Sequence, residues 1–287
     1  MSSFLLLLLN VPFNGVLVRY RASYHPKAAV DDGSVSPAPT FIGLARRVWQ
    51  KQGFGGLTRG FFPTLLAATL LTFFWPLNEY KMYLSPSLCN SRGLLSAVIS
   101  APFYTLAIIT VYRAIVTPRT LDPLNARESL HVLFSAQERK RPWTLYQIPG
   151  LLPALLGHLV IRRFILDYAR RRILPLWGRY ESKEHAVRYA CFTLAVLLAT
   201  IVLAPLEVMT TRLVLQRTME TLPPPVQAVD GEKTVEPATV TIDSDDIVVR
   251  LNDPYSGIVD CFQKIRTEEG WPVLYRMWIV TFIANWV

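Results

Sequence analysis

The stretch NVPFNG, residues 10–15, places Pro12 in an apolar run, and SAPFYT places Pro102 in a similar run 90 residues further on (102 − 12). A second pair has the same offset, because Pro63 in GFFPTLLA and Pro153 in GLLPALLG are also 90 residues apart (153 − 63). Two independent pairs with one offset indicate an internal repeat, which is typical of folds built from copies of one unit.

A third copy of the unit follows. Pro205 in LAPLEV matches the first landmark, and EEGWPVLYRM echoes KQGFGGLTRG of the first unit. Arg59 and Arg276 are 217 residues apart (276 − 59) whereas Pro12 and Pro205 are 193 apart (205 − 12), so the third unit is longer by 24 residues (217 − 193). The surplus falls at about 218–252, whose Pro-rich and acidic sequence predicts a disordered loop. The three predicted repeats are residues 1–84, 91–176 and 186–287.

The composition favours a membrane protein, because 51% of the residues are hydrophobic and 18% are charged. Spanning a bilayer takes about 20 apolar residues in a helix. Runs that contain few or no charges lie at residues 1–18, 61–78, 93–112, 150–161, 189–206 and from Trp278 onward. The sequence therefore predicts an all-α integral membrane bundle of six transmembrane helices, the first and last of them abbreviated. The net charge of +9 is spread between the runs, which favours contact with lipid headgroups over nucleic acid.

Short amphipathic segments connect the apolar runs within each unit. PTFIGLARRVWQKQG and YSGIVDCFQKIRTEEG carry their apolar residues on one helical face, and ARESLHVLFSAQER is a weaker copy of the pattern. We expect three short helices that lie along the membrane surface.

These motifs resemble those of the mitochondrial carrier family. In that family the proline is followed by an acid two residues later and by two basic residues beyond it. Pro205, Glu207 and Arg212 match this pattern, Pro12 and Arg19 match it in part, and in the second unit Pro102 alone remains.

The second half of the family pattern is an acid and glycine, followed by an aromatic, a basic residue and glycine. It is matched by the segments that contain Gly53, Arg59 and Gly60 and by those that contain Glu269 and Arg276. The resemblance covers almost the whole chain and implies six helices around a central substrate site, with alternating access and ion pairs that close each side in turn.

The resemblance assigns structural and gating roles to several residues. Prolines inside membrane helices bend them, so Pro12, Pro102 and Pro205 are predicted helix kinks. The candidate gate residues are Glu207, Arg212, Arg19, Asp167 and Arg170. Glu207 is the only carboxylate among the three proline motifs, so a network of three ion pairs cannot be assembled there.

The candidate substrate residues come from the second helix of two units. Superposing GFFPTLLAATLLTFFW on GLLPALLGHLVIRRFI places Thr72 level with Arg162. An arginine at membrane depth usually faces protein or water, so Arg162 is the best candidate for contact with an anionic substrate. Arg163 and His158 are secondary candidates. The alternative is that these arginines mark the interfacial end of a short fourth helix.

A lipid phosphate is a second candidate ligand. Arg59 and Gly60 open one helix, where free backbone N–H groups suit a phosphate such as that of cardiolipin. Gly150 and Arg276 are the corresponding candidates in the other units. The alternative is that glycine and proline only mark the helix starts.

Two functions remain open at this stage. The first is a solute carrier of a mitochondrial membrane that moves a small anionic metabolite. The second is a non-transporting relative, similar to the carrier-like outer-membrane proteins of the Ugo type, that acts with protein partners in fusion or in membrane-protein insertion. No phosphate loop, dinucleotide fingerprint or cluster of metal ligands occurs in the sequence, so we expect no enzyme activity, no cofactor and no metal site.

Overall fold

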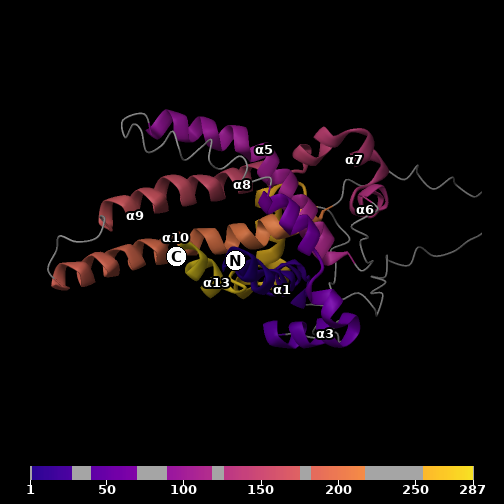
Figure 1. Ribbon diagram of the computed structural model, residues 1–287, viewed down its shortest axis with the longest axis horizontal. Coiled ribbons are helices and arrows are strands. Elements are labelled where there is room, and N and C mark those ends of the chain that lie inside the picture. The colour runs from indigo at the N-terminus through magenta and orange to yellow at the C-terminus, as the bar shows by residue number, and fades with distance from the viewer. Residues whose placement is uncertain are drawn as a thin grey trace, which may run out of the picture.

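The computed structural model describes residues 2–27, 40–69, 89–117, 126–174, 182–216 and 255–286. Every element in these ranges is helical, which confirms the all-α prediction (Figure 1). The predicted insertion at about 218–252 lies outside the described residues, which resume at Tyr255.

Three long helices each contain one of the landmark prolines. They are α1 (Ser2–Ala22) with Pro12, α5 (Cys89–Val116) with Pro102 and α10 (Ser182–Leu215) with Pro205. The three helices pack against one another in all three pairings. They therefore form a triangular centre for the bundle.

The second helices of the second and third units pack against α10. Residues 61–69 are helical. In the second unit α8 (Leu151–Val160) continues through a π-helix, η3 (Ile161–Leu166), into α9 (Asp167–Ile173). In the third unit the helix is α13 (Trp278–Trp286). Figure 1 shows α8 and α9 running beside α10, which also contacts α13.

A left-handed residue precedes each of these second helices. Gly60, Gly150 and Met277 have φ angles of 88°, 79° and 58°. Gly60 and Gly150 are 90 residues apart (150 − 60), and Gly60 and Met277 are 217 apart (277 − 60), which are the offsets of the sequence repeat. Methionine rarely adopts a positive φ, so the geometry of the unit prevails over the preference of the residue there.

The short connecting helices differ between units. The first is α3 (Phe41–Leu57), in which Gly53 is non-helical with φ 63°. The third is α11 (Ile258–Lys264), η4 (Ile265–Glu269) and α12 (Trp271–Leu274). The second consists of α6 (Ala126–Leu133), α7 (Ala136–Lys140) and η2 (Pro142–Gln147).

The prediction of one continuous helix in the second unit is wrong. The chain breaks after Leu133 because Ser135 caps α7, accepting a bond from the Glu138 backbone N–H while the Glu138 carboxylate accepts one from the Ser135 N–H. This reciprocal arrangement is a capping box, and it fixes the start of a new helix.

Hydrophobic length singles out one helix. Within the described residues, Ala186–Leu215 of α10 is long and apolar enough to cross a membrane, and Ala101–Val116 and Leu151–Val160 are shorter apolar helices. Length and composition alone are weak evidence, because a core helix of a soluble protein passes the same test.

Candidate functional site

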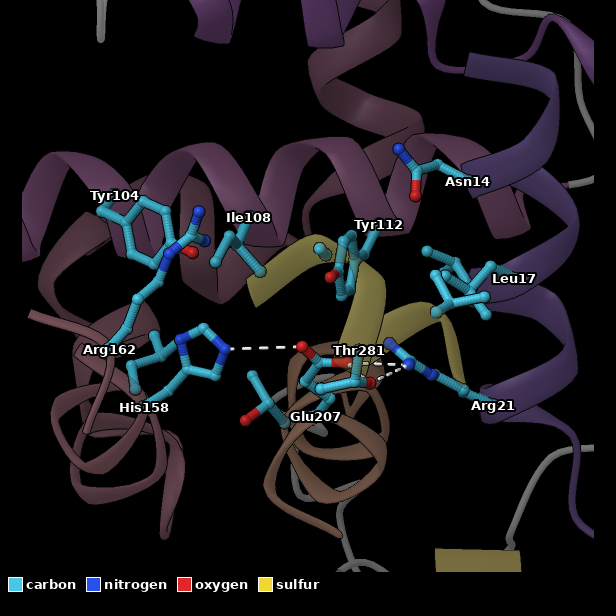
Figure 2. A pocket seen from close by; sticks show the side chains of 15 residues that line it. Asn14, Leu17, Arg21, Tyr104, Ile108, Tyr112, His158, Arg162, Glu207 and Thr281 are labelled. Atoms are coloured by element: carbon cyan, nitrogen blue, oxygen red, sulfur yellow. Dashed lines mark hydrogen bonds and ion pairs between the residues drawn. The ribbon is translucent and has the colours of Figure 1, made fainter. Parts of the chain in front are cut away.

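A cavity of about 190 Å³ lies at the centre of the bundle (Figure 2). Its walls come from α1, α5, α8, η3, α10 and α13. The polar lining residues are Asn14, Arg21, Tyr104, Tyr112, His158, Arg162, Glu207, Thr210 and Thr281. Helices from all three predicted units thus supply polar side chains to one cavity.

Glu207 is the hub of this lining. Its Oε2 lies 2.7 Å from Nη2 of Arg21 and accepts a hydrogen bond of 2.6 Å from the Thr281 hydroxyl. Its Oε1 lies 3.5 Å from Nε2 of His158. One carboxylate of α10 therefore joins α1, α8 and α13 (Figure 2).

The partner of Glu207 is a residue outside the predicted gate set. That set contains Arg19 and Arg212 but not Arg21, with which the ion pair forms. Arg21 lies nine residues after Pro12 (21 − 12), two positions beyond the motif arginine, so motif matching missed it. The segment VRYR, residues 18–21, contains both Arg19 and Arg21, so the sequence did offer a second arginine as a candidate partner.

Arg162 lines the cavity as the sequence suggested. It belongs to η3, and π-helical turns occur often at functional sites because they redirect side chains. The helical run continues through α9 to Ile173, so Arg162 is not at a helix end. His158 lies one turn earlier in the same run, which places both side chains on one face.

The other predicted site residues are placed less completely. Thr72 lies outside the described residues, and for Arg163 and Asp167 the backbone is described but the side chain is not. The Asp167–Arg170 ion pair thus stays a prediction. Arg170 donates a hydrogen bond of 2.7 Å to the Trp286 carbonyl, and its guanidinium carbon lies 5.6 Å from the centre of the Phe192 ring.

An arginine ring closes the bundle beside the cavity. We use this name for Arg19, Arg113 and Arg212, which are all buried near the C-terminal ends of α1, α5 and α10. Each guanidinium donates a hydrogen bond to a carbonyl of the next long helix. The three bonds are Arg19 to Ile115 at 2.7 Å, Arg113 to Val214 at 3.2 Å and Arg212 to Arg21 at 3.3 Å. The cycle satisfies carbonyls that a helix end leaves without a partner.

Each ring arginine also bonds the short helix of its own unit. Nη2 of Arg19 donates to Oε1 of Gln52 at 3.4 Å. Arg113 makes two bonds to the Glu138 carboxylate, at 2.8 and 2.9 Å. Arg212 likewise makes two bonds to Glu269. A paired guanidinium and carboxylate present parallel bonds of matching geometry, so these contacts fix both distance and orientation.

The second unit keeps this link through a compensating shift. Arg19 and Arg212 each lie seven residues after their proline (19 − 12, 212 − 205), but Arg113 lies eleven after Pro102 (113 − 102). Glu138 lies four residues before the position equivalent to Gln52 (52 + 90 = 142). Both partners are displaced by about one helical turn of 3.6 residues, so they still meet. Matching at fixed spacing missed the pair for this reason.

The residues proposed for a lipid phosphate face different surroundings. Arg59 donates a bond of 3.0 Å to the Thr117 carbonyl. A side chain at Gly150 would come within 2.3 Å of the Ile258 backbone nitrogen, so glycine is required there by close approach of α8 to α11. Arg276 does not fit a lipid ligand, because it is buried and donates to the carbonyls of Tyr20 and Ser23.

Comparison of the chain with models of protein families, with curated proteins and with solved structures gives no match. The carrier resemblance therefore rests on the sequence motifs. In the described ranges no group of three or more His, Cys, Asp or Glu side chains could hold a metal ion.

Proposed function

We propose that the chain is an integral membrane protein of the mitochondrial carrier type, which moves a small anionic solute across a mitochondrial membrane by alternating access. The observation that carries this proposal is the central cavity, walled by helices of all three units and closed at one end by the arginine ring. The fold class that goes with it is a bundle of three two-helix repeats.

The distribution of side chains supports a membrane setting. Arginines and glutamates are buried inside the bundle, whereas large apolar side chains face outward on several helices. The outward-facing set includes Phe62, Leu66, Phe103, Leu106, Leu156, Val160, Leu194, Leu198, Ile201, Val202, Ile279 and Ile283. Lipid is the solvent that suits exposed apolar side chains on several helices, because in water large apolar surfaces are costly to expose.

The charges of the cavity support an anionic solute. Arg21 and Arg162 carry one positive charge each and Glu207 carries one negative charge, so the lining is formally +1 with His158 neutral. Arg21 is already paired with Glu207, whereas the Arg162 side chain is exposed and lines the cavity. Arg162 is therefore the group that we assign to the solute.

Alternating access requires the closed end to open. In carriers with three ion pairs at this level the pairs break when the end opens. Here the proline motifs of α1 and α5 contain no carboxylate, and the long helices are joined by the Arg21–Glu207 ion pair and by the bonds from the arginine ring to backbone carbonyls. Opening would separate each arginine from the neighbouring helix while its bond to its own short helix persists. Each unit would then move as one body.

The test is solute uptake into liposomes that contain the purified protein. Labelled succinate, inorganic phosphate, glutamate and ADP represent the classes of anionic solute. We expect uptake of at least one of them, reduced about 30-fold by Arg162→Ala, since losing a charge-assisted bond costs about 2 kcal/mol. Arg172→Ala is the matched control, because Arg172 is exposed on α9 and lies over the Tyr168 ring. Absence of uptake for every class would contradict the proposal and favour the non-transporting alternative.

A further inference from the structure

A second hollow lies on the outside of the bundle and shares no lining residue with the central cavity. It is a groove of about 280 Å³, lined by Leu197, Thr200 and Ile201 of α10, by Tyr275 at the end of α12 and by Trp278 at the start of α13. Leu197, Ile201 and Trp278 are 41%, 49% and 43% exposed. The groove is therefore open to the surroundings of the bundle, which are lipid in the proposed membrane setting.

The kink of α10 leaves a hydrogen-bond acceptor at this groove. Pro205 has no backbone N–H, so the Ile201 carbonyl, four residues earlier (205 − 201), lacks its usual partner within the helix. The Tyr275 hydroxyl donates to this carbonyl at 3.3 Å. A carbonyl oxygen has two lone pairs, so it can accept a second hydrogen bond from a ligand in the groove.

The rest of the groove is apolar or already bonded. The Thr200 side chain is 3% exposed, and its hydroxyl donates to the Val196 carbonyl at 2.7 Å. No charged side chain is among the described residues that line the groove. The ligand that fits is therefore apolar over most of its surface and carries one hydrogen-bond donor.

The tryptophans beside the groove indicate its depth in a bilayer. Trp271 and Trp278 lie at the starts of α12 and α13 and are 49% and 43% exposed. Tryptophan is enriched where lipid headgroups meet the acyl chains. From the level of Ile201, exposed Leu197 and Leu194 continue one face of α10 away from the closed end. The acceptor thus lies near the interface, and an apolar face extends from it towards the acyl chains.

We propose that this groove binds a membrane sterol, with the sterol hydroxyl donating to the Ile201 carbonyl and the fused rings lying along Trp278 and Leu197. A sterol has one hydroxyl on a rigid apolar body, and a rigid ligand loses little conformational entropy when it binds. A phospholipid acyl chain has no donor and would leave the carbonyl to Tyr275 alone. The inference goes beyond the proposed transport function and uses only its membrane setting.

Photolabelling in liposomes tests the proposal. The purified full chain is reconstituted in phosphatidylcholine with a cholesterol analogue that carries a diazirine on its rings, and labelled peptides are identified by mass spectrometry. We expect labels at residues 197–201 and 275–278 that excess cholesterol removes. Cholestenone, which has a ketone in place of the hydroxyl, should compete about five-fold more weakly, the effect of losing one hydrogen bond. Labels spread evenly over the lipid-facing helices overturn the site, and equal competition by the ketone overturns the role of the hydroxyl.

Three variants locate the ligand. Ile201→Trp fills the groove and should reduce labelling by about ten-fold, since the contact area with the rings is lost. Leu198→Trp is the matched control and should label as the parent protein does, because Leu198 is 57% exposed on the same helix and does not line the groove. Tyr275→Phe removes the hydroxyl that shares the Ile201 carbonyl, so labelling should persist or rise by up to about five-fold.

Equal loss of labelling in the two tryptophan variants, or its loss in Tyr275→Phe, overturns the assignment. Solute uptake is measured separately in the same liposomes without sterol. A failed sterol test therefore leaves the transport proposal standing.

Discussion

The arginine ring and the central cavity use the same residue types in opposite ways. In the ring, each guanidinium is buried and bonded both to carbonyls of the neighbouring helix and to a partner on its own short helix. In the cavity, Arg162 is exposed and projects from a π-helical turn. The difference indicates that the arginines of the ring hold the helices together, whereas Arg162 can meet a solute from its exposed position in the cavity.

The largest effect is expected from Glu138→Ala at the closed end. The side chains of Glu138 and Arg113 are 0% and 2% exposed, so removing one partner leaves a buried charge bonded to carbonyls alone. Breaking a buried pair of this kind costs about 3–5 kcal/mol, and loss of the capping box adds about 1 kcal/mol. Chemical denaturation of the detergent-solubilised protein measures the change in unfolding free energy.

The control for this variant is Glu128→Ala. Glu128 lies in the first turn of α6 and is exposed, so its removal should change stability by less than about 1 kcal/mol. Equal losses in the two variants would show that the buried pair does not hold the closed end.

The next effect is expected from Gly150→Ala, at the start of α8. The positive φ of 79° disfavours a side chain, and the added Cβ would lie 2.3 Å from a backbone nitrogen of α11. Left-handed strain costs about 1–2 kcal/mol and displacement of the helix adds to it. Gly55→Ala is the matched control, because nothing lies within 4 Å of a Cβ there. A thermal shift assay should show Gly150→Ala less stable by about 2–3 kcal/mol.

The closed end also contains a histidine, His25, whose environment contrasts with that of His158. Burial, together with the positive charge of Arg276, lowers the pKa of His25 to about 4 from its ordinary value of 6.5. The folded state therefore favours neutral His25, and the contribution of this group to the free energy of unfolding is fully present above pH 6.5. This contribution is lost progressively as the pH falls from 6.5 towards 4, because the unfolded chain binds the proton more readily than the folded chain does.

We expect this loss to reach about 2 kcal/mol by pH 4.5, allowing for partial screening by solvent. His25→Gln should flatten the pH dependence of stability over this range. The measurement is the denaturation midpoint between pH 4.5 and 7.5. A pH profile that His25→Gln leaves unchanged would mean that His25 does not set the pH dependence of stability.

The sequence was sufficient for those features that depend on spacing along one chain. The recurrence of Pro12, Pro102 and Pro205 located the three long helices, and Arg162 was singled out as a cavity residue because charge at that depth is costly. Both inferences use local chemistry and a fixed period.

Features that depend on contacts between units were not accessible in the same way. The Arg113–Glu138 pair was not predicted, because both residues are displaced by one helical turn, in opposite directions, from the positions that the repeat spacing gives. Only the packing of the helices shows that they still meet. The Arg21–Glu207 pair escaped because a helix presents several residues to its neighbour and motif spacing singled out only one of them. Arg276 matched a lipid-phosphate motif, yet in the bundle it turns inward to the end of α1.

The smallest effect on stability is expected from Arg162→Ala in the cavity. The side chain is exposed, so its removal should change the unfolding free energy by no more than about 0.5 kcal/mol. The same variant should lose most anion binding, because the remaining lining charges of Arg21 and Glu207 compensate each other. Stability and succinate binding measured on one preparation therefore distinguish the two regions. If Arg162→Ala destabilised the protein as strongly as Glu138→Ala, Arg162 would belong to the structural set, and the division of arginines between holding helices and meeting a solute would be wrong.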